Sequence, residues 1–202
     1  HEQLRVWCSS SVELHRLSEL DFLPYDSSQP SAISYQMIDR LRALATLTLY
    51  KKSDKPPLIV TSALAIMSKT IPHKDFLAAC HILKPDMAAE PLKLLRRWQS
   101  LGYEVEDVVE VPGQMSKRGG IIDVFPPCSQ LPVRIEFFGN QIEGMRYFDP
   151  ESQRSTSPVS SLIVTPAQEL ISITGGCEVR AGSVLDYLGS DALLVLDDPG
   201  GI

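Results

Sequence analysis

The stretch RGGIIDVFPPCSQLPVRIEFF, residues 118–138, decides how the middle of this chain folds. It predicts a β-hairpin. Alternation along the second strand puts three apolar side chains on one face: Val133, Ile135 and Phe137. The other face then carries a cation, an anion and an aromatic ring: Arg134, Glu136 and Phe138. An aromatic ring flanked by charges on an exposed strand is typical of a protein-binding hot spot. The alternative is that Phe138 covers a neighbouring helix.

Composition limits the classes of protein that the chain can represent. It has 202 residues, of which 44% are hydrophobic and 22% are charged. This is enough for one large globular domain or two small ones. No apolar run reaches about 18 residues, so we expect no membrane-spanning segment. The net charge of −6 and the pI near 5.2 do not favour nucleic-acid binding by the surface as a whole, although a local basic patch could bind.

The cysteines and histidines do not predict a metal site. The four cysteines are far apart and form no C-x-x-C pair: Cys8, Cys80, Cys128 and Cys177. The four histidines do not cluster with them, so we expect no zinc ion. Scattered single cysteines are typical of a reducing compartment, which predicts a cytoplasmic protein. The chain starts at His1 without a signal-peptide pattern, and we interpret it as a fragment of a longer protein.

Strands and helices alternate over residues 1–80, which predicts part of a parallel α/β lobe. The expected strands lie at 4–7 and 58–61. Helices are expected at 11–17 and 34–49, and a further helix should be capped by Ser62 and stopped by Pro72. A loop rich in turn-forming residues, LPYDSSQP, is expected at 23–30.

The character of the chain changes near residue 81. Over 81–166, short strands joined by turns predict an antiparallel sheet with one packed helix, an α+β arrangement. The helix is expected at 87–101, with an apolar face formed by Leu92, Leu95 and Trp98. The tail, 167–202, returns to α/β character. A lobe cut in this way leaves an open sheet edge, so we expect the fragment to be a monomer or a dimer caused by truncation.

No set of residues predicts catalysis by this chain. A phosphate-binding loop is absent, because Gly-Lys never occurs. The run LLVLDD, 193–198, resembles a magnesium-holding strand, and the alternative is a buried strand that ends in two solvated acids, Asp197 and Asp198. Three other acids are expected at turns and helix starts: Asp21, Asp26 and Asp39. The basic stretch GQMSKRGG, 113–120, either cradles a phosphate or connects a hairpin.

The longest diagnostic segment is VPGQMSKRGGIIDVFPPCSQLPVRIEFFGNQIEGMRYFDPESQRS, residues 111–155. It closely resembles the middle domain of the bacterial transcription-repair coupling factors (Mfd), and a related block occurs in the excision-repair protein UvrB. The segments LPYDSSQP and PLIVTSALAIMSKTIP resemble the first lobe of the same family, so the similarity covers about the whole chain. UvrB carries a long aromatic hairpin after the first of these segments, and this chain has no room for it. The coupling factors are therefore the better match.

The resemblance implies a RecA-like lobe, 1–80 and 167–202, interrupted by an inserted domain, 81–166, that docks the damage sensor UvrA. It implies that UvrA contacts Arg118, Arg134 and Phe138, with Glu136 as a fourth residue. We expect Arg134 to offer its planar guanidinium to a carboxylate of the partner, and the bend at Gly119 to leave the guanidinium of Arg118 free. In the family a C-terminal domain masks this surface until the protein engages RNA polymerase. The polymerase-binding domain and the DNA translocase, which uses ATP and magnesium, are implied to lie outside this fragment.

Two alternatives belong to other functional classes. The first is a fragment of a UvrB-type enzyme, which depends on nucleotide and binds damaged DNA. The second is a nucleic-acid-binding surface around Lys117 and Arg118, although two cations are too few for useful affinity at physiological salt.

Overall fold

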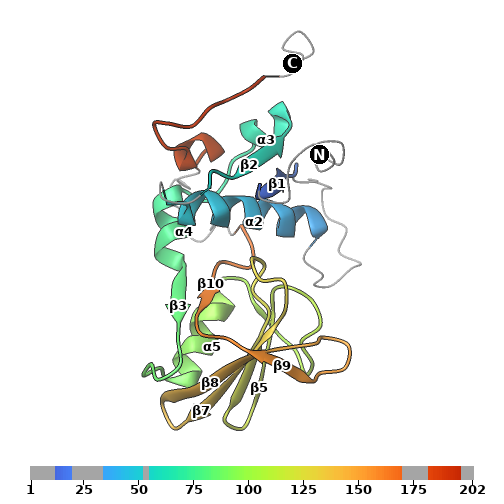
Figure 1. The fold of residues 1–202 in the computed structure, drawn as a ribbon, viewed down its shortest axis with the longest axis vertical. Coiled ribbons are helices and arrows are strands. Elements are labelled where there is room, and N and C mark those ends of the chain that lie inside the picture. The colour runs from blue at the N-terminus through green and yellow to red at the C-terminus, as the bar shows by residue number, and fades with distance from the viewer. Residues whose placement is uncertain (1–11, 20–33, 52–54, 170–181, 197–202) are drawn as a thin grey trace, which may run out of the picture.

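The computed structural model describes residues 12–19, 34–51, 55–169 and 182–196. In this part of the chain, a small α/β unit lies at one end of the molecule and an antiparallel sheet at the other (Figure 1). Each has its own cluster of buried apolar side chains. The expected combination of a parallel α/β part and an α+β part is confirmed.

The α/β unit is built on the parallel pair β1 (Leu14–Leu17) and β2 (Leu58–Thr61). Helix α2 (Tyr35–Leu49) packs on this pair, and Ser34 caps its first turn through a bond from the Met37 N–H. The remaining elements are α3 (Ala63–Met67), α4 (His73–Ala79) and the short 3-10 helix η1 (Val184–Tyr187). The predicted helix at 34–49, the strand at 58–61 and the Ser62 cap are confirmed.

Three expectations for this unit are wrong. The stretch 14–17, expected within a helix, is strand β1, because each of its residues pairs with one of β2. Pro72 does not end a helix: α3 already ends at Met67, and Pro72 lies at the N-terminus of α4. Residues 193–196 form no buried strand but are exposed, because no strand among the residues that the structure describes pairs with them. The residues of the predictions for 4–7, 23–30, Asp21, Asp26, Asp197 and Asp198 lie outside the described part of the chain.

The antiparallel part contains a six-stranded sheet in the order β4-β5-β6-β7-β8-β9. Within this sheet the β4–β5 pair is parallel, and the other four pairs are antiparallel. A separate antiparallel pair, β3 (His81–Leu83) and β10 (Leu162–Val164), closes the domain. The six strands are β4 (Glu104–Val105), β5 (Gln114–Arg118), β6 (Ile121–Val124), β7 (Val133–Phe138), β8 (Gln141–Phe148) and β9 (Ser155–Pro158).

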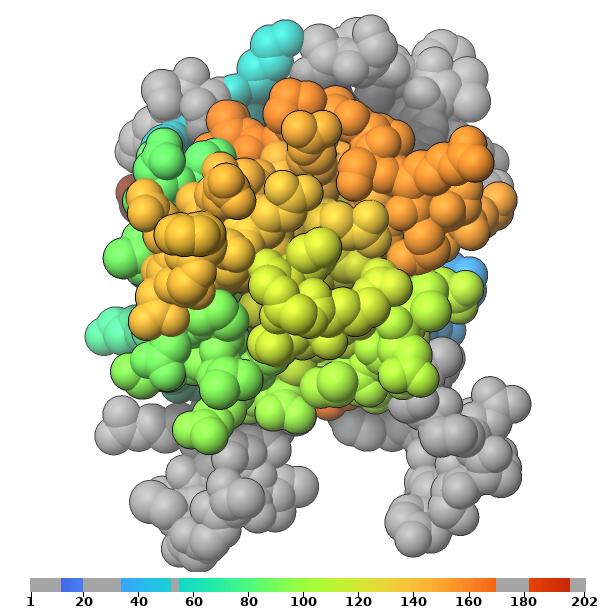
Figure 2. Space-filling model, turned by 90° about the horizontal axis from the view of Figure 1, so that it is seen from below, coloured from blue at the N-terminus to red at the C-terminus, as the bar shows by residue number. Residues whose placement is uncertain are grey.

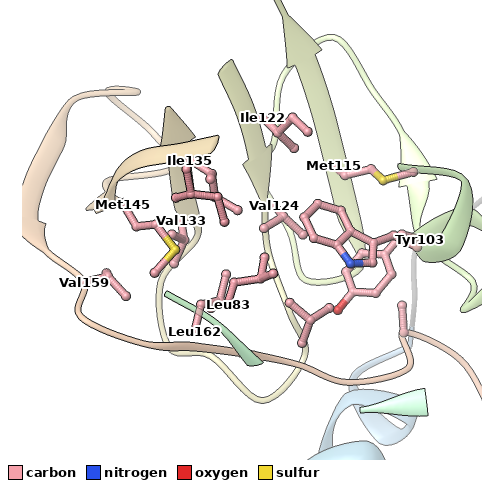
Figure 3. Close-up of a cluster of buried hydrophobic side chains, with 14 residues drawn as sticks. Leu83, Tyr103, Met115, Ile122, Val124, Val133, Ile135, Met145, Val159 and Leu162 are labelled. Atoms are coloured by element: carbon pink, nitrogen blue, oxygen red, sulfur yellow. The ribbon is translucent and has the colours of Figure 1, made fainter. Parts of the chain in front are cut away.

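The core of this part is formed by side chains of the sheet and of helix α5 (Pro91–Ser100). Figure 3 shows its labelled side chains gathered beside the strands. Trp98 of α5 is fully buried, and Leu94 and Leu95 pack beside it. Leu92, expected on the same face, is exposed. The helix starts at Pro91 rather than near 87, since proline is favoured in the first turn, where its missing N–H costs no helical bond.

A buried ion pair ties the chain, just after it leaves the antiparallel part, to helix α2. Arg40 of α2 pairs with Glu169, which follows β10, and both side chains are almost completely inaccessible to solvent. Thr70 donates a second hydrogen bond to the Glu169 carboxylate at 2.7 Å. Burial raises the pKa of Glu169, and the neighbouring Arg40 and Thr70 oppose that shift. Removing either partner would leave an uncompensated buried charge, so the pair fixes where the chain leaves the antiparallel part.

Candidate protein-docking face

Cross-strand register defines one face of the six-stranded sheet, which we call the outer face. Paired residues of neighbouring strands point to the same side. Asp123 pairs with Arg134, and Arg134 pairs with Arg146. The next row runs from Arg118 through Ile121 to Glu136. The outer face therefore consists of these residues and Phe138, opposite the buried core residues Val124, Val133 and Ile135.

The alternation expected along β7 is present. Val133 and Ile135 are buried, and Phe137 packs against the same core cluster. Phe138 points the other way and is 80% exposed, so the idea that it covers a neighbouring helix is wrong. It stands immediately before the turn at Gly139, whose φ of +60° suits glycine because that residue has no Cβ. The β7–β8 hairpin thus presents a large aromatic ring to solvent.

Arg134 does not offer a free guanidinium. Its Nε donates to Oδ1 of Asp123 at 2.8 Å, and its Nη2 donates to Oδ2 at 2.9 Å. Its Nη1 donates to the backbone carbonyl of Gln153 at 3.2 Å. The guanidinium carbon also lies 4.7 Å from the centre of the Phe148 ring. Its side chain is only 16% exposed, so the expectation of an unoccupied fork is wrong.

These contacts stabilise the charged form of Arg134. The hydrogen bonds to Asp123 raise the pKa of Arg134, and the charge of Glu136 adds to the effect, whereas partial burial opposes it. A bidentate pair between a guanidinium and a carboxylate also fixes the plane of both groups. Arg134 is therefore a rigid part of the outer face.

Asp123 is the residue that the sequence prediction missed. Its side chain is only 1% exposed, and its Oδ2 also accepts a hydrogen bond from Nη2 of Arg118 at 3.0 Å. Arg118, expected to be free, thus has one N–H engaged but keeps 55% of its side chain exposed. The signal was available: Asp123 alternates with the apolar Ile122 and Val124, so it had to share a face with the charged residues of β7.

At one end of the outer face, Val109, Phe125 and Phe148 form a small buried apolar cluster. This cluster lies at the Arg134 end, whereas Phe138 lies at the opposite, open end of β7. Figure 2 looks onto the end of the molecule formed by the antiparallel part, where residues of the sheet and its hairpins form a continuous surface. The outer face is thus supported at one end and accessible at the other.

The remaining sequence hypotheses do not converge on a second site. GQMSKRGG forms part of strand β5 and the β5–β6 turn, in agreement with a hairpin connection. Lys117 and Arg118 are neighbours on a strand and therefore point to opposite faces, which separates the two cations. Among residues 12–19, 34–51, 55–169 and 182–196, no three His, Cys, Asp or Glu side chains are arranged to hold a metal ion. Over the same residues, no helix is long and apolar enough to cross a membrane.

Comparison with known proteins agrees with this architecture. Residues 82–170 match the family described as the UvrB interaction domain. The transcription-repair-coupling factor of Myxococcus xanthus is 35% identical over 168 residues, which are 83% of this chain and 14% of that protein. The coupling factor of Bacillus subtilis is 36% identical over 162 residues, or 80% of this chain and 13% of that protein. The UvrABC system protein B of Chlorobaculum tepidum is 29% identical over 171 residues, 81% of this chain and 25% of that protein.

The antiparallel part thus matches the UvrB interaction domain family. The chain that contains it is a homologue of the transcription-repair-coupling factors, and it spans about a seventh of the length of the coupling factors it matches.

Proposed function

We propose that this chain is a non-catalytic interaction module of a transcription-repair coupling factor, and that it recruits the excision-repair protein UvrA to stalled RNA polymerase. The docking surface in this proposal is the outer face, with Arg118, Arg134, Glu136 and Phe138 as its working residues. The observation that supports it most strongly is the exposure of Phe138 beside a fixed group of charges. A free protein gains nothing by holding a phenyl ring in water, whereas a partner with an apolar slot would remove it from water.

The proposal gives the two parts of the chain different tasks. Residues 81–166 form the inserted docking domain, and residues 1–80 and 167–202 belong to the RecA-like lobe that carries it. The separate hydrophobic clusters of the two parts support this division. Engagement of RNA polymerase and ATP-driven translocation on DNA are assigned to the larger part of the parent protein, outside this chain.

The proposal is tested by removing the Phe138 ring. We predict that Phe138→Ala weakens binding to purified UvrA by about 30- to 1,000-fold, because loss of a hot-spot aromatic costs about 2–4 kcal/mol. Surface plasmon resonance with immobilised UvrA would measure this. The matched control is Met67→Ala, which truncates an equally exposed apolar side chain (78%) on α3, in the other part of the chain. Equal affinities for the wild-type chain and both variants would contradict the proposed docking surface.

A further inference from the structure

One buried carboxylate organises the charges of the outer face. Asp123 accepts hydrogen bonds from Arg134 on both oxygens and from Arg118 on Oδ2. These three residues come from three adjacent strands, β6, β7 and β5. A buried carboxylate needs a partner of opposite charge, and the bidentate pair with Arg134 supplies it. Arg134 alone thus neutralises the charge of Asp123, and the bond from Arg118 is not required for that purpose.

The two arginines differ in what they can still offer. Each of the three guanidinium nitrogens of Arg134 already donates a hydrogen bond. The guanidinium also lies against the Phe148 ring, and little of the Arg134 side chain is exposed to solvent. Arg118 makes one charged hydrogen bond to Asp123, and more than half of its side chain is exposed. A guanidinium carries more N–H donors than this single bond uses. Arg118 can thus hold Asp123 and a second carboxylate at the same time.

Their positions in the register differ as well. Arg118 lies in the cross-strand row of Ile121 and Glu136, whereas Arg134 lies in the row of Asp123 and Arg146. Phe138 is the next outward-facing residue of β7 after Glu136. The row of Arg118 is therefore closer to the exposed ring than the row of Arg134.

We infer that Asp123 is a positioning residue, which locks Arg134 into the sheet and aims Arg118 at a carboxylate of the partner. This inference rests on the proposed function and refines it: Arg118 and Phe138 touch the partner, and Arg134 acts through Asp123. The complementary patch on UvrA then consists of an apolar slot beside an acidic side chain. Truncation of Arg134 still weakens binding, because it leaves Asp123 buried without its main partner.

The network itself can be tested without UvrA. In ¹H–¹⁵N spectra of the chain, the Nε–H of Arg134 should give a signal protected from solvent exchange, because it donates to a buried oxygen. Asp123→Asn keeps the shape of the side chain but removes its charge and one of its two acceptor oxygens, and it should weaken this protection. Backbone amide signals of β6 and β7 report whether the sheet stays intact. An Arg134 signal equally protected in Asp123→Asn would overturn the inference.

The role in docking is tested by a double-mutant cycle with UvrA. We expect Arg118→Ala to weaken UvrA binding about tenfold or more in the wild-type background, and much less in the Asp123→Asn background, because the carboxylate no longer aims Arg118. Arg96→Ala, a truncated exposed arginine on α5, is the control. Equal costs of Arg118→Ala in both backgrounds would overturn the positioning role. If instead Phe138→Ala has no effect on affinity, the proposed function fails, and the Arg134 signal still decides whether Asp123 positions that side chain.

Discussion

At the scale of single residues, His81 shows how a buried polar contact sets a pH dependence. His81 opens β3, at the junction of the two parts, and its Nε2 accepts a hydrogen bond from the Trp98 indole N–H at 2.9 Å. Burial lowers the pKa of His81, and the nearby Arg97 lowers it further, whereas a bond to the Ala79 carbonyl opposes the shift. The folded chain therefore favours neutral His81, the form that can accept the bond from Trp98.

This lowered pKa predicts that acid destabilises the chain through His81. The stabilising contribution is complete above the unfolded-state pKa of about 6.5. It is lost as the pH falls below that value, because the unfolded chain then binds a proton that the folded chain resists. Urea denaturation at a series of pH values between neutral and mildly acidic would measure the slope. His81→Gln keeps an acceptor without titrating, and it should flatten the slope; an unchanged slope in this variant would contradict the assignment.

The outer face shows what the sequence can predict about a residue and what it cannot. Alternation along β7 correctly separated Phe138 from the core, because the two faces of a strand are fixed by backbone geometry. The alternation does not predict that Asp123 binds the guanidinium of Arg134, since that depends on which residue of β6 lies opposite Arg134. The pairing register between strands is set by turns and packing rather than by either strand alone.

At the scale of elements, helix α2 carries the largest share of the α/β core. Leu41 and Leu44 are fully buried in it, together with Ala43. Its start is fixed by Ser34, whose hydroxyl accepts a hydrogen bond from the Met37 N–H at 3.2 Å. The first turn carries no acidic residue, so no side-chain charge assists this cap. The stability of α2 should therefore be sensitive to this single side chain.

Removing the cap gives a prediction for the element. Ser34→Ala should lower the free energy of unfolding by about 0.5–2 kcal/mol, because one N–H of the first turn loses its acceptor. The midpoint of urea denaturation, followed by circular dichroism, would measure the change. Ser34→Asp restores an acceptor and adds a favourable charge at the helix N-terminus. A Ser34→Asp variant as unstable as Ser34→Ala would show that the cap is not the cause.

Element prediction failed where the tertiary structure overrides the local pattern. The stretch 14–17 is short enough to be read as a helix or a strand, and pairing with β2 decides for the strand. The segment around Pro72 was expected to close a helix, but proline suits a helix start equally well. The exposed run 193–196 has a strand-like composition and no strand to pair with in the part of the chain that the structure describes.

At the scale of the whole molecule, side chains of α2 link the two parts. Arg42 donates from Nε to the backbone carbonyl of Pro127 at 2.7 Å, and Arg40 pairs with Glu169, where the chain has just left the antiparallel part. The connection preceding β7 is thereby tied to α2. The β7–β8 hairpin, which carries Phe138, lies at the end of the antiparallel part remote from this junction (Figure 1). A partner could therefore occupy it while the α/β unit remains attached to the rest of a longer protein.

The most direct test of the central claim is site-specific photo-crosslinking. A benzophenone amino acid in place of Phe138 preserves an aromatic side chain and reacts only with groups next to it. We predict that it forms a covalent adduct with UvrA on irradiation, whereas the same probe in place of Met67 forms none. Mass spectrometry would identify the adduct. A folded chain that crosslinks to UvrA from position 67 but not from position 138 would contradict the claim that the outer face is the docking surface.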